Sequence, residues 1–175
     1  MPRPFWRQQP GIQLTDKTPA EWDRAMELYN GFDVEAGARD LLSTIGYLRA
    51  MKVCNGKVGA VGYCLGGKLA FLISTRSDID ASVSYYGVGL DGMLDEIHEI
   101  RSPLLLHIAA LDKFMPEPVQ QKVLKAITRN SFITAHVYEG ADHAFARPNG
   151  QNYVKAAADL ANARTDQFFT QYLHS

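Results

Sequence analysis

Cys64 lies in a short stretch whose residue types and spacing suit nucleophilic chemistry. It is flanked by glycines in the pattern Gly62-x-Cys64-x-Gly66, the spacing of a nucleophile elbow, in which a strained strand-to-helix turn lifts the central side chain above a sheet. We expect any side chain at position 62 or 66 to crowd the packing of strand and helix. The helix N-terminus favours negative charge, so it would favour a Cys64 thiolate and support a developing oxyanion at the backbone N–H of Leu65.

Two other interpretations of this stretch need no reactive thiol. Free cysteines are often buried, so Cys64 could be a structural residue in an ordinary strand-to-helix turn. The stretch also matches most of the phosphate-binding loop motif, as Gly62-x-x-x-x-Gly67-Lys68. The motif requires a Ser or Thr next, whose hydroxyl binds magnesium, but Leu69 occupies this position. The residues therefore argue against nucleotide binding and leave the structural interpretation open.

An acid and a histidine follow two later predicted strands. Asp112 comes after the apolar run 104–108, and His143 comes after the run 134–138. In parallel α/β sheets the chemistry lies at the carboxyl ends of the strands, and the chain order nucleophile, acid, histidine is that of α/β-hydrolases. His143 would exchange a proton with Cys64 and the leaving group, and Asp112 would orient the imidazole. Each alone is more often an ordinary loop residue, so the prediction of a triad depends on their combination.

Two further residues are candidates for substrate binding. Arg147 lies four residues after His143 and could hold a substrate carboxylate in a bidentate fork, although a single loop arginine is usually solvated. Tyr85 and Tyr86 end a predicted strand, and alternation of side chains should direct only one of them to the site. We take Tyr85 as the substrate-binding residue.

The elements that must position these residues alternate along the chain. A capping box at Thr18 and a cap at Asp33 predict two helix starts before the elbow. Strands alternating with helices predict an α/β fold with a mainly parallel sheet flanked by helices. The predicted strands span 58–61, 81–86, 104–108 and 134–138, and the predicted helices span 19–30, 33–51, 68–73, 117–129 and 153–173.

The composition is that of an ordinary globular chain. A length of 175 residues predicts one domain, and a net charge of -1 gives no general attraction to nucleic acid or to an acidic membrane surface. Five histidines, with no His or Cys pair at ligand spacing, argue against a structural metal site. Cys54 and Cys64 form no disulfide framework, and no apolar signal core or transmembrane span is present. We therefore expect a cytoplasmic location.

Four stretches together carry a resemblance to a known family. The chain resembles the dienelactone hydrolases, or carboxymethylenebutenolidases, over nearly all of its length. A cysteine elbow combined with the stretch from His143 to Arg147 is strongly specific for them. The four stretches are 62–67, 85–89, 111–116 and 143–147.

The resemblance implies an α/β-hydrolase fold and a triad of Cys64, Asp112 and His143 that forms a thioester acyl-enzyme. Such enzymes open cyclic enol-lactones, typically dienelactone to maleylacetate in the breakdown of chloroaromatic compounds. The resemblance also matches Arg147 with the arginine that binds the substrate carboxylate, and Leu65 with a donor of an oxyanion N–H. It implies no metal and no organic cofactor.

The start of the chain departs from the family pattern. Family members have several strands before the stretch that corresponds to 5–11, together with a glutamate that holds or activates the cysteine and a loop that donates a second oxyanion N–H. A further family arginine has no convincing match at Arg24. We therefore expect a single, N-terminally shortened α/β-hydrolase domain over 1–175 with one unpaired sheet edge. A longer natural chain or the pairing of two copies, as a homo-oligomer, would cover this edge.

Two functions follow from these observations. The first is a hydrolase that acts on a small carboxylate-bearing lactone or ester through a thioester on Cys64. The alternative is a catalytically impaired fragment, or a binding or assembly module, that retains the triad. A working site needs a thiol at Cys64 that reacts faster than the one at Cys54.

Overall fold

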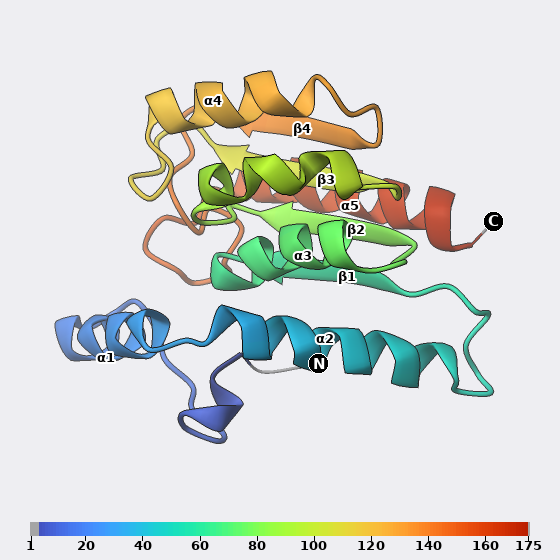
Figure 1. Ribbon diagram of the computed structural model, residues 1–175. Helices are drawn as coiled ribbons and strands as arrows, with labels where there is room; N and C mark the ends of the chain where they lie inside the picture. The colour runs from blue at the N-terminus through green and yellow to red at the C-terminus, as the bar shows by residue number, and fades with distance from the viewer. Residues whose placement is uncertain (1–3, 175) are drawn as a thin grey trace.

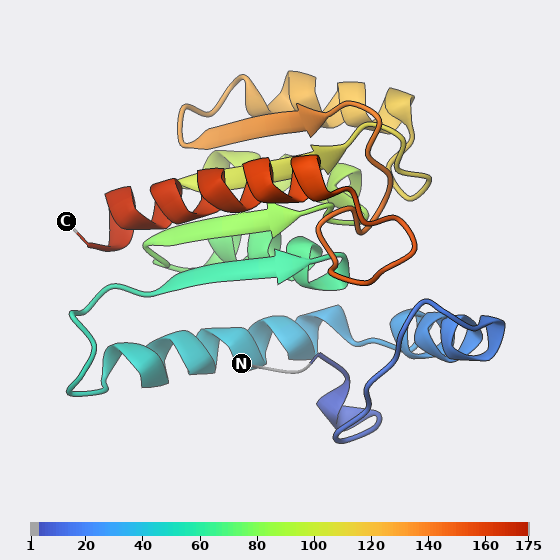
Figure 2. The same cartoon turned by 180° about the vertical axis from the view of Figure 1, so that it is seen from behind.

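The computed structural model describes residues 4–174 as a four-stranded parallel sheet with helices on both faces (Figures 1 and 2). The strands lie side by side in chain order, which is the arrangement that consecutive strand–helix–strand crossovers produce. The strands are β1 (Gly59–Tyr63), β2 (Ala81–Tyr85), β3 (Leu104–Ala109) and β4 (Ile133–Tyr138). The α/β sheet predicted from the sequence is confirmed.

Helices cover the two faces of the sheet unequally, and the helices Pro19–Asn30 and Val34–Arg49 lie on the β1 side of the sheet in both views. Figure 1 shows α3, η2 and α4 in front of the sheet, and Figure 2 shows α5 alone across the other face. The helices are η1 (Pro4–Arg7), α1 (Pro19–Asn30), α2 (Val34–Arg49), α3 (Leu65–Arg76), η2 (Leu90–Glu99), α4 (Glu117–Ile127) and α5 (Lys155–Leu173). No helix within residues 4–174 combines the length and the apolar character needed to cross a membrane.

Local capping sets the starts of the first two long helices, as predicted. The Thr18 hydroxyl accepts a hydrogen bond from the Glu21 backbone N–H at 3.3 Å and donates one to the Glu21 carboxylate at 2.9 Å. The Asp33 carboxylate accepts a hydrogen bond from the Ala36 N–H at 2.9 Å. Each cap satisfies a backbone donor that the first turn leaves without a partner.

Strand pleating divides the core into two clusters. Leu104 and Leu106 of β3 pack against the α3, η2 and α4 layer, whereas the intervening Leu105 packs on the α5 side. Successive side chains of a strand point to opposite faces, so β2 and β3, which are covered on both faces, are buried along their whole length.

β1 forms one edge of the sheet. Within the described residues it pairs only with β2, and Val61 and Tyr63 remain 45% and 46% exposed. On the other side of the strand, Ala60 packs with Ile45 of α2 and Ile73 of α3. The pairing of β1 with β2 alone agrees with the prediction that one edge of the sheet is unpaired. That a second copy of the chain covers this edge stays a prediction.

The sequence pattern does not predict η2. This segment is a 3₁₀ helix that begins after Gly89, which has a left-handed φ of 64°. A 3₁₀ helix has three residues per turn, so its apolar residues do not follow the α-helical spacing used to predict the other helices. Its buried residues, Leu90, Met93 and Ile97, nevertheless complete the larger core cluster.

Candidate active site

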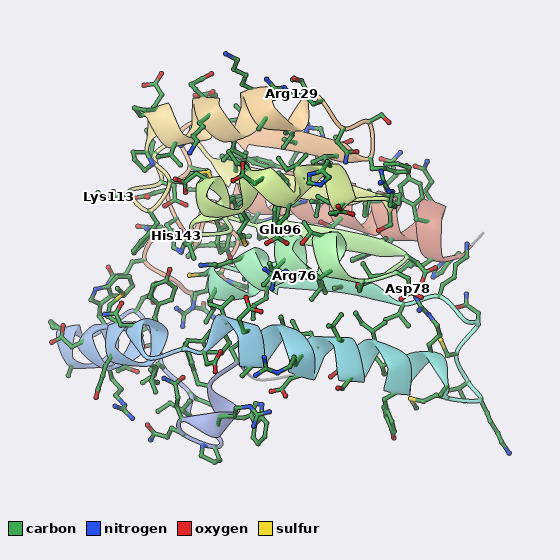
Figure 3. The ribbon with its side chains drawn as sticks, viewed as in Figure 1. Arg76, Asp78, Glu96, Lys113, Arg129 and His143 are labelled. Atoms are coloured by element: carbon green, nitrogen blue, oxygen red, sulfur yellow. The ribbon has the colours of Figure 1, made fainter. Side chains whose placement is uncertain are left out.

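The three predicted catalytic residues come from segments at the carboxyl end of the sheet. Cys64 directly follows β1, while Asp112 and His143 lie in the loops after β3 and β4. His143 Nδ1 and Asp112 Oδ2 are 2.8 Å apart, and the two residues are only 9% and 2% exposed. The parallel sheet therefore brings together groups that are far apart in the chain, and Figure 3 shows His143 at this end of the molecule.

The Asp112 carboxylate is held by a hydrogen bond to each of its oxygens. Oδ2 faces the His143 ring, and Oδ1 accepts a hydrogen bond from the Phe114 backbone N–H at 2.8 Å. A buried carboxylate is stable only when its oxygens have such partners. Because Nδ1 of His143 is occupied by Asp112, Nε2 is the ring nitrogen that remains for proton exchange.

Cys64 occupies a strained backbone conformation. Its φ of 55° and ψ of -116° are rare for a residue other than glycine, and they cost on the order of 1–3 kcal/mol. The Cys64 N–H donates to the Tyr85 carbonyl at 3.1 Å, and the Cys64 carbonyl accepts from the Lys68 N–H at 3.0 Å. These bonds fix the turn between β1 and α3, as in a nucleophile elbow.

His143 is electrostatically linked to both neighbours. Burial by itself lowers the pKa of His143, but the hydrogen bond to Asp112 and the interaction with the Cys64 side chain outweigh it and raise the pKa to about 9. The imidazole is therefore protonated at neutral pH.

Leu65 is the first residue of α3. The first N–H groups of a helix have no acceptor within the helix, so the Leu65 N–H is free of intrahelical bonding and lies next to the thiol-bearing residue. It can donate to an oxyanion that forms on a carbonyl attacked by Cys64.

Arg147 is anchored to the N-terminal segment. One of its terminal nitrogens donates to the Leu14 carbonyl at 2.8 Å, and no carboxylate among the described residues forms an ion pair with it. A guanidinium has five N–H donors, so several remain for a ligand. Burial raises the pKa of Tyr86, and the positive charge of Arg147 partly offsets this rise.

The prediction that Tyr85 lines the site is wrong. Its side chain lies on the α5 face of β2, where the hydroxyl hydrogen-bonds with Asn162 at 2.9 Å and Thr165 at 2.7 Å. Tyr86 follows the end of the strand with a φ of 37°, and its ring centroid lies 5.2 Å from that of His143. Strand alternation therefore directs Tyr85 into the core, and the positive φ directs the next residue to the site.

Of the two elbow glycines at which we expected a side chain to be crowded, Gly62 and Gly66, only Gly62 is crowded. A Cβ on Gly62 would lie 1.9 Å from the Gly66 carbonyl oxygen, but a Cβ on Gly66 would meet no atom within 4 Å. Gly67 is the second crowded position, since a Cβ there would lie 2.7 Å from the Tyr85 carbonyl oxygen. The expected crowding at Gly66 is therefore wrong, because this residue faces open space on the first turn of α3.

Two aromatic side chains that the sequence did not single out lie near His143: Phe114 contacts its ring, and Trp22 contacts Phe114. The Phe114 ring centroid is 4.7 Å from that of His143, and the Trp22 ring of α1 is 6.2 Å from Phe114. Phe114 lies within the stretch that also carries Asp112, but nothing in the spacing of Trp22 links it to the site.

Two further features of the described residues can be compared with this site, candidate metal ligands and a surface groove. Within residues 4–174, no group of three or more histidine, cysteine, aspartate or glutamate side chains is arranged to hold a metal ion. A groove of about 330 Å³ lies between β4 and α5, and no triad residue lines it.

The elbow geometry predicts opposite outcomes for two neighbouring glycines. Gly62→Ala should lower the free energy of unfolding by about 3 kcal/mol or more, because the new methyl group overlaps backbone that cannot move freely. Gly66→Ala should leave it unchanged or raise it by up to about 1 kcal/mol, because the methyl group enters open space on a helix. Urea unfolding of both variants checks this. Equal destabilisation by the two changes would contradict the geometry.

The raised pKa of His143 predicts how the stability of the site depends on pH. The stabilising contribution of the imidazolium should be fully present below the unfolded-state pKa of about 6.5 and be lost as pH rises through about 9. The difference in unfolding free energy between the wild type and His143→Gln should therefore shrink from pH 6 to pH 10. Comparing Cys64→Ala with the double variant Cys64→Ala/His143→Gln removes the effect of Cys64 and leaves the part of the stabilisation that comes from Asp112. A difference that grows with pH would refute this assignment.

Comparison with known proteins agrees with this arrangement. Residues 5–173 match the dienelactone hydrolase family. A relative from Azospirillum brasilense, provisionally named carboxymethylenebutenolidase, is 48% identical over 170 residues, which are 97% of this chain and 73% of the relative. The carboxymethylenebutenolidase of Pseudomonas knackmussii is 42% identical over 164 residues, which are 94% of this chain and 70% of that protein.

A solved structure shares the fold at lower sequence identity. The crystal structure of a Klebsiella pneumoniae protein, provisionally identified as a dienelactone hydrolase, superposes with a TM-score of 0.80 at 22% identity, covering 97% of this chain and 73% of the other. The family match spans nearly the whole chain, and the identities to the two relatives are high. This chain therefore belongs to the dienelactone hydrolase family, whose members are carboxylic-ester hydrolases with the α/β-hydrolase fold.

Proposed function

We propose that this chain, as a single α/β-hydrolase domain over 1–175, hydrolyses a small carboxylate-bearing lactone or ester of the dienelactone kind. Cys64 is the nucleophile, His143 is the general acid and base, and Asp112 positions His143. The buried 2.8 Å hydrogen bond between His143 and Asp112, combined with the effect of Cys64 on the same imidazole, carries this proposal. A thiol nucleophile suits a reducing compartment, so the proposed location is the cytoplasm.

Acylation begins from the pair of thiolate and imidazolium. The Cys64 sulfur attacks the substrate carbonyl carbon, and the oxyanion that forms accepts a hydrogen bond from the Leu65 N–H. The intermediate collapses as the carbon–oxygen bond to the leaving group breaks, and the leaving oxygen takes the proton from His143 Nε2. The product of this step is a thioester on Cys64 and a neutral His143. An enolate leaves readily, so an enol-lactone needs little help from the acid.

Deacylation restores the starting state. Neutral His143 accepts a proton from water, and the resulting hydroxide attacks the thioester carbonyl. The carbon–sulfur bond breaks, Cys64 leaves as the thiolate next to the new imidazolium, and the carboxylic acid departs. Asp112 stabilises the charged imidazole in this step without taking its proton.

Arg147 is the proposed partner of the substrate carboxylate. It lies four residues after His143 in the same loop, and its bond to the Leu14 carbonyl holds the side chain in place while leaving other donors free. A fixed guanidinium loses little conformational freedom when it binds an anion.

Turnover of dienelactone tests the nucleophile. The wild type should consume dienelactone, followed by its ultraviolet absorbance, and Cys64→Ala should reduce kcat by about three orders of magnitude or more. Cys54→Ala should retain activity, because Cys54 lies on the loop before β1, at the opposite end of that strand, and hydrogen-bonds the Lys57 carbonyl at 3.6 Å. Full activity in Cys64→Ala would overturn the proposal. A folded wild type without turnover would favour the alternative of an impaired or non-enzymatic module.

Substrate charge tests the role of Arg147. Arg147→Met should raise KM for a carboxylate-bearing lactone about tenfold or more and leave KM for a neutral ester unchanged, because only the first substrate loses an ion pair. Arg129→Met is the matched control, since Arg129 is exposed near the end of α4, away from His143 (Figure 3). Equal losses on the charged and the neutral substrate would contradict the assignment.

A further inference from the structure

Trp22 and Phe114 form a pair of partly exposed aromatic rings next to His143. Their ring centroids are 6.2 Å apart, and Phe114 lies 4.7 Å from the imidazole. Trp22 remains 44% exposed and Phe114 40% exposed. We call this pair the aromatic wall. Much of its surface is therefore exposed instead of being buried in the core.

The helix that carries Trp22 is not held by burial in the main core. Leu28 is the only buried residue of α1, and polar contacts connect the helix to the N-terminal segment: Gln8 donates to the Leu28 carbonyl at 2.9 Å, and Arg24 donates to Gln9 at 2.6 Å. Figures 1 and 2 both show α1 beyond the carboxyl ends of the strands. Trp22 therefore does not serve to pack α1 against the main core.

One face of α1 is directed toward the site. Trp22 and Tyr29 are seven residues apart, which is two helical turns, so they lie on the same side of the helix. Phe114 contacts Trp22. Burial and the charge of Cys64 both raise the pKa of Tyr29, which is consistent with this face being turned toward the thiol. Through Phe114, the aromatic wall connects this face of α1 to the imidazole of His143.

We infer that the aromatic wall selects substrates whose leaving group carries a flat, unsaturated or aromatic ring, an inference that rests on the proposed function. Aromatic faces attract other π systems in offset and tilted arrangements beyond what burial alone supplies. The leaving group is the relevant side because His143 must lie within hydrogen-bond reach of the leaving atom, and Phe114 packs against that imidazole.

Two matched thioesters test this selectivity. The probes are the monothioesters of succinic acid with 2-phenylethanethiol and with 2-cyclohexylethanethiol. They share a free carboxylate, and the ring lies two carbons from sulfur, so the two thiols leave with nearly equal ease. The released thiol is measured by chromatography. The wild type should show a kcat/KM about tenfold higher for the phenyl probe, and Trp22→Leu should bring the ratio close to one.

Two further variants distinguish loss of the aromatic contact from a general loss of structure or activity. Trp22→Phe should restore most of the ratio, because it restores an aromatic face. Trp6→Leu should leave the ratio unchanged, since Trp6 is 48% exposed on η1 and hydrogen-bonds with Asp40. A wild-type ratio near one, or a ratio that Trp22→Leu does not lower, would overturn the inference while leaving the proposed function intact.

A binding measurement makes the inference independent of turnover. The chain contains two tryptophans, so in Trp6→Phe the fluorescence comes from Trp22 alone. Titration with 3-phenylpropanoate should change this emission and give a Kd several-fold lower than titration with 3-cyclohexylpropanoate. If the wild type does not turn over dienelactone, the proposed function fails, and this titration still decides the inference. Equal affinities for the two acids would refute it.

Discussion

The site depends on how closely β1 approaches the start of α3. Gly62 lies against the Gly66 carbonyl so tightly that a single added carbon would come within 1.9 Å of it, and Gly67 is crowded by the neighbouring strand. This close approach leaves only Cys64 to turn the chain from strand to helix, and it does so at a positive φ. Its side chain therefore stands at the turn, beside the free N–H groups of the helix. Without these glycine contacts, the proposed nucleophile Cys64 and the proposed oxyanion donor Leu65 would not be held at the same turn.

The second requirement is that a buried imidazole carries charge. Burial opposes this, but Asp112 and Cys64 reverse the effect and raise the pKa of His143 to about 9. Asp112 can do so because its other oxygen is satisfied by a backbone N–H. The loops after β3 and β4 thus supply a charge pair whose members stabilise one another in a site that neither could occupy alone.

The surroundings of the triad come from outside the sheet. Arg147 is held by the Leu14 carbonyl, and Trp22 approaches Phe114 from a helix that buries only Leu28. The segments that contact the substrate in our proposals are therefore separate from the residues that hold the core together. Substitutions on α1 could alter substrate choice with little effect on the free energy of unfolding.

The sequence by itself determined the capped helix starts, the parallel α/β fold, and the order of Cys64, Asp112 and His143, because caps, strand patterns and strand ends are local features of the chain. Only the tertiary structure decided that Tyr85 faces α5 and that Trp22 lies beside the site. The face that a strand-end side chain takes depends on backbone torsions that residue type does not specify. The contact between Trp22 and the loop after β3 depends on how two segments about ninety residues apart in the chain pack together, which no local pattern records.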